Sequence, residues 1–87
     1  MLHINRIMLS GTVKSISKPI TLAQKRIVKF VLDAKCEVNV FCKGSLAKNV
    51  EKFIKPDKEV LVEGSLEATN GLKIIADQIT FLDRTEK

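Results

Sequence analysis

Hydrophobic and polar residues alternate in the stretch NRIMLSGTVK, from Asn5 to Lys14. In an extended chain, one side of this stretch carries Ile7, Leu9, Gly11 and Val13, and the other side is mostly polar. A period of two is typical of a β-strand that buries one side. Glycine inside a strand often marks a bulge or a bend. The pattern therefore predicts a long strand that bends at Gly11 and pairs with a different neighbour on each side of the bend.

Four later segments repeat this alternation and are predicted as strands. They are residues 25–34, 36–43, 58–68 and 72–83. Residues 15–24 lose the alternation and contain Pro19, which has no amide donor, so we expect a loop or an irregular strand end there. Asn70-Gly71 predicts a hairpin with a type I′ turn between the last two strands, because both central residues of that turn need positive φ.

The period changes between residues 45 and 54, where the apolar positions form one helical stripe. The stripe consists of Leu46, Ala47, Val50, Phe53 and Ile54. Ser45 is a suitable N-cap, and Pro56 ends the helix. Glu51 and Lys55 are spaced for an ion pair on one helix face. The helix lysines, which are Lys48, Lys52 and Lys55, are interpreted as a solvated face.

Three strands, one helix and two strands follow one another in a single domain that comprises residues 1–87. This order predicts a mainly β protein, the five-stranded OB-fold Greek-key barrel with one helix between strands 3 and 4. An α+β sandwich is the alternative if one of the segments is not a strand. In the barrel, Phe30, Phe53 and Phe81 fall on positions that face the core. A domain this small is only modestly stable alone, so self-association is expected to add stability.

The charge balance favours an anionic partner. Lys and Arg number 15 against 10 Asp and Glu, which gives a net charge of +5. Nucleic acid is one such partner, and a lysine-rich surface without a polyanionic ligand is the alternative. No apolar run approaches the roughly 20 residues that span a bilayer, and the N-terminus lacks the order of a signal peptide. We therefore expect a cytoplasmic protein that does not contact the membrane.

Residues that could support catalysis or metal binding are few. Cys36 and Cys42 lie six residues apart in one predicted strand, which is about 20 Å and too far for a disulfide. Together with the lone His3 they do not supply the ligands of a structural zinc site. There is no nucleophile–base arrangement and no phosphate-cradling glycine loop. We expect no metal, no cofactor and no enzymatic activity, and two reduced cysteines of which Cys42 is partly buried.

Five stretches together resemble one protein family. They are NRIMLSGTV, KFVLD, GSLAKNVEKFI, EVLVEGSLEA and IIADQITFLD, in this order between Asn5 and Asp83. Their order and spacing are similar to those of the bacterial single-stranded DNA-binding protein family, which includes primosomal replication protein N (PriB). The resemblance implies an OB-fold that holds single-stranded DNA, as a homodimer in PriB and usually as a tetramer in the general binding proteins.

Two departures from the general binding branch make PriB the nearer relative in character. That branch carries a Gly/Pro/Gln-rich tail with an acidic end, whereas this sequence stops four residues after Asp83. It also relies on several aromatic residues for stacking, and this sequence has no Trp or Tyr. Where that branch often has an aromatic residue before a glycine, Lys43 precedes Gly44. The resemblance therefore implies a dimer in preference to a tetramer.

The expected binding surface is the outer face of the second and third predicted strands, where OB-folds bind single strands with help from adjacent loops. The candidate residues on or beside it are Lys14, Lys18, Lys25, Arg26, Lys29, Asn39, Phe41 and Lys43. Their basic side chains would neutralise phosphates, and Phe41 offers one ring to a base, although an outward ring can equally fill a subunit interface. One ring predicts binding dominated by phosphate contacts, with little sequence preference and strong salt sensitivity.

Three carboxylates on the fourth predicted strand complicate this picture. Glu59, Glu63 and Glu67 are spaced along one face and would repel phosphates. Either the bound strand avoids that face, or the carboxylates meet lysines across a dimer contact.

The function predicted from these observations is non-catalytic binding of single-stranded DNA in DNA replication or replication restart. Replication or primosome proteins are the expected further partners, and RNA is an alternative ligand. A protein-interaction OB module in a replication complex is the alternative function.

Overall fold

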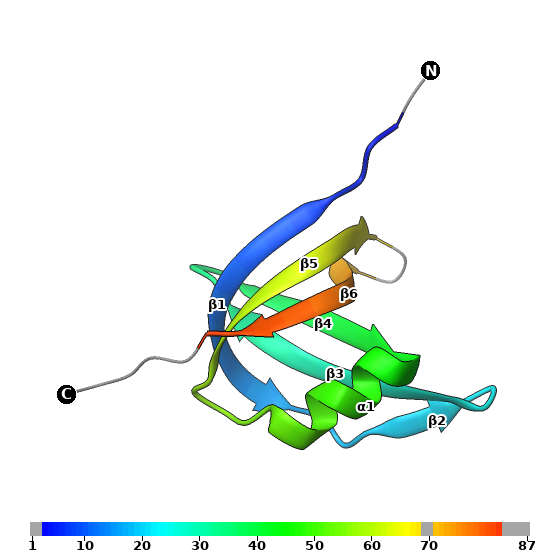
Figure 1. Ribbon diagram of the computed structural model, residues 1–87. Coiled ribbons are helices and arrows are strands. Elements are labelled where there is room, and N and C mark those ends of the chain that lie inside the picture. Colours follow the sequence, from blue (N-terminus) through cyan, green and yellow to red (C-terminus); the bar gives the residue numbers. More distant parts are fainter. Residues whose placement is uncertain (1–2, 69–70, 83–87) are drawn as a thin grey trace.

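The computed structural model describes residues 3–68 and 71–82, and β-strands make up most of it (Figure 1). Its elements are β1 (Ile7–Ile16), β2 (Ile20–Leu22), β3 (Lys25–Asp33), β4 (Glu37–Lys43), α1 (Gly44–Phe53), β5 (Glu59–Glu67) and β6 (Lys73–Phe81). The five long strands and the helix are those predicted from the sequence. The helix lies between the third and the fourth of the long strands, as expected.

β1 joins two parts of the sheet. It pairs antiparallel with β5 over residues 7–12 and with β3 over residues 12–16, which confirms the predicted change of partner. Gly11 lies next to this change, and a Cβ atom there would sit 2.5 Å from the carbonyl oxygen of Asp33. The position therefore requires glycine because two backbones approach closely. The irregularity in register falls later, between residues 13 and 15.

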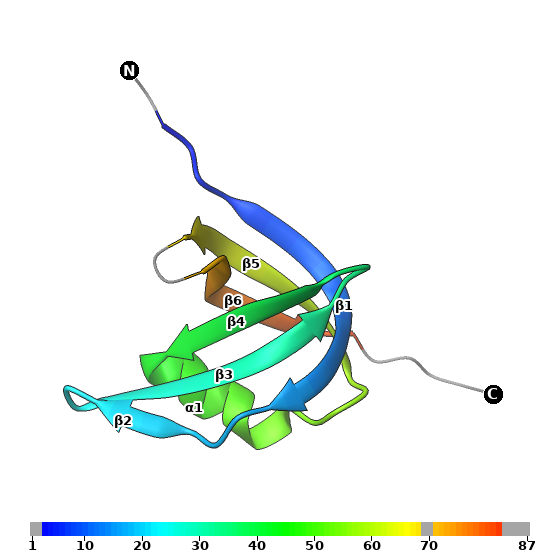
Figure 2. The ribbon, with the colours of Figure 1, turned by 180° about the vertical axis from the view of Figure 1, so that it is seen from behind.

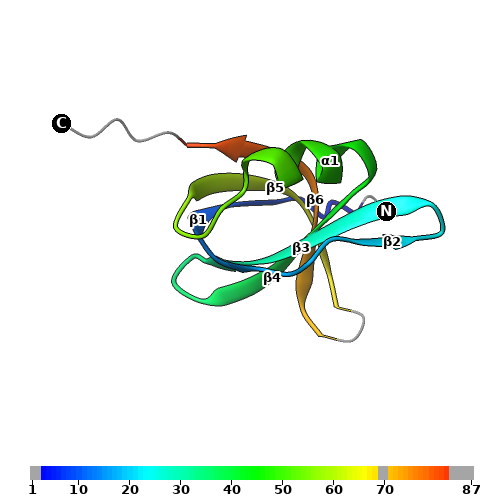
Figure 3. The same cartoon turned by 90° about the horizontal axis from the view of Figure 1, so that it is seen from below.

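The sheet closes into a barrel. The strand order is β1-β5-β6-β4-β3, and β3 pairs with β1 again. Neighbouring strands are antiparallel except for β4 and β6, which run parallel and pair residues 39–41 with residues 73–75. Figure 3 shows the strands arranged around one interior, with α1 along one side of it. The closed five-stranded barrel confirms the predicted OB-fold and excludes the α+β sandwich.

β2 extends β3 into a hairpin within the segment that was expected to be a loop or an irregular strand end. Its three residues pair with residues 25–27 of β3, and the connection consists of Ala23 and Gln24, with φ of 50° and 64°. Positive φ at both residues of a two-residue turn is the type I′ pattern. All three residues of β2 are exposed, so no apolar alternation marks this strand in the sequence.

Aliphatic side chains and one aromatic ring fill the barrel interior. The buried residues are Val13, Val28, Phe30, Leu32, Val40, Cys42, Ala47, Val50, Ile54, Val60, Val62, Ile74 and Ala76. Phe30 is fully buried as predicted, and Phe81 is half-buried against this core. The prediction for Phe53 is wrong, because this residue is 58% exposed. With about 3.6 residues per turn, the buried stripe is centred between Val50 and Ile54, and Phe53 lies at its margin.

Both the start of α1 and its ion pair differ from the prediction. The helix begins at Gly44 without a side-chain cap, so Ser45 lies inside the first turn and is not the N-cap. Glu51 bonds to Arg26 of β3 instead of Lys55. The helix has already ended where Lys55 occurs, so the helical spacing of that pair is not realised.

The hairpin of β5 and β6 is described up to the pair of Glu67 with Lys73. Gly71 has a φ of 103°, in the region that favours glycine. Asn70 lies outside the described residues, so the predicted type I′ turn lies outside them too.

Both cysteines are free thiols, Cys36 on the surface and Cys42 in the core. Cys42 is fully buried, which is more than the partial burial expected. Burial raises the pKa of the Cys42 thiol to about 12, because an apolar interior disfavours the thiolate.

Candidate nucleic-acid interface

The outer face of β3 and β4 carries half of the predicted binding residues. Side chains alternate along both strands, and the inward set fills the core. The outward set pairs across the two strands as Ile27 with Lys43, Lys29 with Phe41, and Val31 with Asn39. Figure 2 shows both strands on the side of the barrel that faces away from α1. The structure thus brings Lys29, Asn39, Phe41 and Lys43 together on one face.

Phe41 is flanked by two cationic side chains on this face. The Nζ atom of Lys29 lies 5.9 Å from the centre of its ring, and the Nζ atom of Lys73 lies 5.2 Å from it. Ammonium groups at these distances are attracted by the electron-rich face of an aromatic ring. The ring is half-buried, so part of it remains open to solvent. A partly open ring between two cations can meet a base and its neighbouring phosphates together.

Lys73 is a candidate site residue that sequence analysis missed. It is the first residue of β6, and it lies beside Asn39 in the parallel pairing of β4 and β6. No local pattern points to it, because its position depends on how the barrel closes. One signal in the sequence could have identified it. Lys73 begins the last predicted strand, which in an OB-fold lies beside the third long strand.

Lys14 reaches a carboxylate. Its Nζ atom donates a hydrogen bond to Oε2 of Glu37, at the end of β4 that follows the β3–β4 turn. This hydrogen bond raises the pKa of Lys14, because the carboxylate stabilises the charged ammonium. Both side chains are exposed, so Lys14 can exchange this partner for a phosphate only at the cost of the bond to Glu37.

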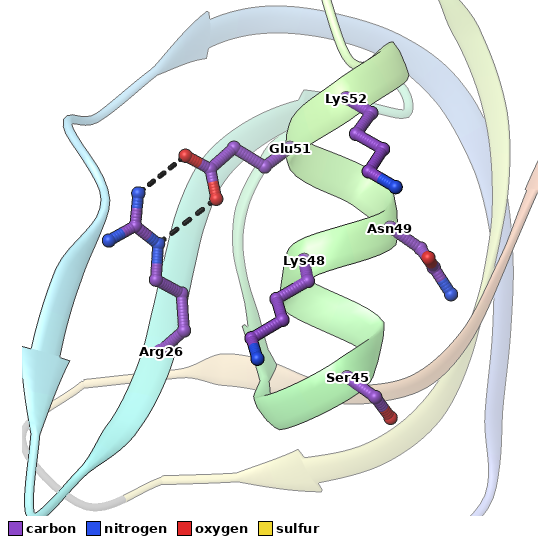
Figure 4. A pocket seen from close by; sticks show the side chains of 6 residues that line it. All are labelled: Arg26, Ser45, Lys48, Asn49, Glu51 and Lys52. Atoms are coloured by element: carbon purple, nitrogen blue, oxygen red, sulfur yellow. Dashed lines mark hydrogen bonds and ion pairs between the residues drawn. The ribbon is translucent and has the colours of Figure 1, made fainter.

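Arg26 points to the other side of the sheet from Lys29. It has the same strand parity as the buried Val28, and it extends towards α1 (Figure 4). Its Nε and Nη2 atoms donate to the two carboxylate oxygens of Glu51, at 3.0 and 2.6 Å. These bonds raise the pKa of Arg26 and lower the pKa of Glu51. The structure therefore separates Arg26 from the outer face of β3 and β4.

Lys18 and Lys25 lie at the β2–β3 hairpin. Lys18 is exposed in the connection between β1 and β2, and Lys25 is exposed beside the turn, where it pairs with Leu22. Lys25 is four residues from Lys29 along β3, about 13 Å in an extended strand. Lys25 therefore continues the outward-facing row of β3 that includes Lys29, and Lys18 lies in the connection before β2.

Glu63 of β5 has a basic partner within the same chain. Nη2 of Arg6 lies 3.7 Å from Oε1 of Glu63, and Nη1 of Arg6 lies 2.7 Å from Oδ2 of Asp77. A lysine from a second subunit is thus not required to explain this carboxylate. In the sheet, β6 also separates β5 from β4.

Two further findings concern other kinds of site. In residues 3–68 and 71–82, no three His, Cys, Asp or Glu side chains are grouped closely enough to hold a metal ion. No helix in this part of the chain is both long enough and apolar enough to cross a membrane. The candidate site consists of cationic, amide and aromatic side chains.

The barrel and helix α1 define a small OB-fold protein. Several solved structures of single-stranded DNA-binding proteins share this fold. The second such protein (SSBb) of Mycobacterium smegmatis superimposes with a TM-score of 0.84 at 19% identity, covering 95% of this chain and 98% of that chain. The SSB domain of a Synechococcus protein gives 0.83 at 17% identity, covering 92% and 98%.

PriB from Ralstonia solanacearum has the same architecture. It superimposes with a TM-score of 0.81 at 17% identity, covering 92% of this chain and 100% of that chain. No protein-family model and no curated protein sequence matches this chain. At these identities the comparisons show a shared fold, and at the level of structure they confirm the resemblance to single-stranded DNA-binding proteins and PriB.

Proposed function

We propose that this protein binds single-stranded DNA across the outer face of β3 and β4. The observation that carries the proposal is the position of the Phe41 ring between the ammonium groups of Lys29 and Lys73. A ring flanked by cations offers a stacking surface to one base and opposite charges to the adjacent phosphates. The fold shared with proteins named for binding single-stranded DNA supports the same class of ligand.

The proposed binding mode is weighted towards phosphate contacts. Lys29, Lys73 and Lys43 neutralise the backbone, and Asn39 offers hydrogen bonds from its amide. Phe41 stacks with one base, a contact that typically contributes about 1–3 kcal/mol and tolerates any base. Binding of this kind has little sequence preference and depends strongly on salt.

The cellular role that fits this binding mode is the protection or presentation of unpaired DNA during replication or replication restart. The protein acts without catalysis, in the cytoplasm, as a homodimer that works with other replication proteins. The sequence resemblance to PriB and the shared fold support this role.

Fluorescence anisotropy of a labelled oligo-dT, measured at several salt concentrations, tests the proposal. Affinity should fall with salt, with a log–log slope of about −0.7 for each phosphate neutralised. Absence of binding at low salt would contradict DNA binding and favour the protein-interaction module.

Single-charge variants test the face. Lys29→Gln and Lys73→Gln should each weaken binding and reduce the salt slope by about 0.7. Arg6→Gln is the control, because Arg6 is an exposed cation that pairs with Glu63 of β5 and Asp77 of β6, away from the β3–β4 face. If the three variants weaken binding equally, the β3–β4 face is not the site.

A further inference from the structure

The exposed side of α1 forms a basic furrow that continues past the end of the helix. One hollow beside the helix is lined by Arg26, Ser45, Lys48, Asn49, Glu51 and Lys52 (Figure 4). A second hollow is lined by Lys52, Phe53, Lys55, Lys58 and Phe81. Lys52 lines both hollows, so they form one surface, which we call the helix furrow.

The charge of the helix furrow is carried by lysines. Arg26 and Glu51 compensate each other through two hydrogen bonds, and within residues 3–68 and 71–82 no other carboxylate lines either hollow. Lys48 and Lys52 are four residues apart in the helix, which places them about 6 Å apart along its axis. Positive charge is therefore spread along the furrow instead of being concentrated at one point.

Two aromatic rings lie at one end of the furrow. Phe53 is 58% exposed, and its ring meets that of Phe81 edge-on, with 6.0 Å between ring centres and 64° between ring planes. An edge-on neighbour occupies one part of the Phe53 surface and leaves the rest open. Core packing does not account for this exposure, because Ala47, Val50 and Ile54 already cover the barrel. An open ring beside lysines is a stacking position for a base.

We propose that the helix furrow is a second binding track for single-stranded nucleic acid. The inference rests on the proposed function for its class of ligand. A furrow with spaced lysines and an open ring at one end fits a single-stranded nucleic acid, because its phosphates recur along the chain and its bases can stack on the ring. Helix α1 and the outer face of β3 and β4 lie on different sides of the barrel (Figures 1 and 2). A long strand can thus contact both, while a short strand contacts one.

Photocrosslinking with an oligonucleotide that contains 5-iodouracil tests the track, because this base crosslinks to aromatic rings on which it stacks. Cleavage after lysine and arginine separates Phe41, Phe53 and Phe81 onto three peptides. The oligonucleotide should be about twice the upper site size of one OB-fold, or about 32 nucleotides. Crosslinks are expected on the Phe41 peptide and on the Phe53 or Phe81 peptide.

The crosslinking outcomes separate the two proposals. Crosslinks on the Phe41 peptide alone would overturn the second track and leave the proposed function standing. Crosslinks on the Phe53 or Phe81 peptide alone would support the track and overturn the β3–β4 face. No crosslink on any of the three would overturn both as stacking sites.

A charge variant gives an independent measurement. Lys52→Gln should reduce the salt slope for the long oligonucleotide by about 0.7, whereas the control Arg6→Gln should leave the slope unchanged. Equal slopes in both variants would overturn the inference. It would also be overturned if Lys52→Gln left DNA binding intact and weakened binding of a labelled peptide of alternating Asp and Phe, because the furrow would then be a protein-docking site.

Discussion

Phe41 is the side chain on which base contact at the β3–β4 face depends. Among the phenylalanines, Phe30 is in the core, Phe53 is the last residue of α1, and the ring of Phe81 meets that of Phe53. Phe41 is held in place by its cross-strand neighbour Lys29 and by strand pairing on both sides of β4. Because the ring is half-buried, its loss affects ligand contact more than core packing.

Replacing the ring should weaken DNA binding measurably. Phe41→Ala removes a stacking contact of about 1–3 kcal/mol, which corresponds to a loss of affinity of about 5- to 150-fold. Phe41→Tyr keeps the ring and should retain most of the affinity. Both are measured by oligo-dT anisotropy, with thermal melting as the check on folding. Equal affinity of Phe41→Ala and the unmodified protein would show that the ring does not stack.

Cys42 makes stability depend on pH in the alkaline range. Its folded-state pKa of about 12 lies above the ordinary value of 9.0, so the folded protein retains the thiol proton where the unfolded chain has lost it. The stability from this group is complete below about pH 9 and is lost as pH rises towards 12. Urea unfolding between these pH values should show a decline that is smaller in Cys42→Ala. An identical decline in that variant would assign the effect to other groups.

The β2–β3 hairpin contains a turn whose residues do not suit its backbone. Ala23 and Gln24 both adopt positive φ, which disfavours residues with a Cβ atom by roughly 1–2 kcal/mol each. Asn-Gly is the preferred pair for such a turn. Ala23→Asn with Gln24→Gly should therefore raise the free energy of unfolding by about 1 kcal/mol, as measured by urea denaturation. A decrease would mean that the hairpin is not formed in solution.

Gly64 allows β5 and β6 to pair closely at an irregularity in their register. A Cβ atom at this position would lie 2.1 Å from the carbonyl oxygen of Ile75. Gly64→Ala should therefore destabilise the protein by at least about 1–3 kcal/mol, the usual cost of overpacking. Ser65→Ala, one residue along the strand, is the control and should change urea unfolding little. Similar stability of the two variants would show that the backbones of β5 and β6 move apart at this point without loss of stability.

The long strands and the helix were predictable because each buries one side, and burial leaves a period in the sequence. All three residues of β2 are exposed, so this strand has no hydrophobic period in the sequence, and Ala23 and Gln24 are not residues that indicate a turn. Local pattern placed Lys29 and Phe41 correctly on one face. It did not reveal Lys73, whose position depends on closure of the barrel, or the pairing of Arg26 with Glu51, which depends on how α1 packs on β3.

Assembly of the barrel into a dimer is expected from an unpaired strand edge. Within the described residues, the part of β1 from Ile7 to Gly11 pairs with β5 only, so its other edge is available to a second chain. Light scattering over a range of dilutions should report two subunits. Four subunits would contradict the dimer and match the general binding proteins, and a monomer would contradict self-association.

The parallel junction of β4 and β6 is the shortest of the pairings that close the barrel. Lys73 and Phe41 stand on opposite sides of it, so fluctuations that part these strands carry the ammonium group away from the ring. A polynucleotide held by both residues bridges the gap and opposes such opening. Occupancy should accordingly slow hydrogen exchange at the amides that pair β4 with β6, so that the bound polynucleotide stabilises the closed barrel.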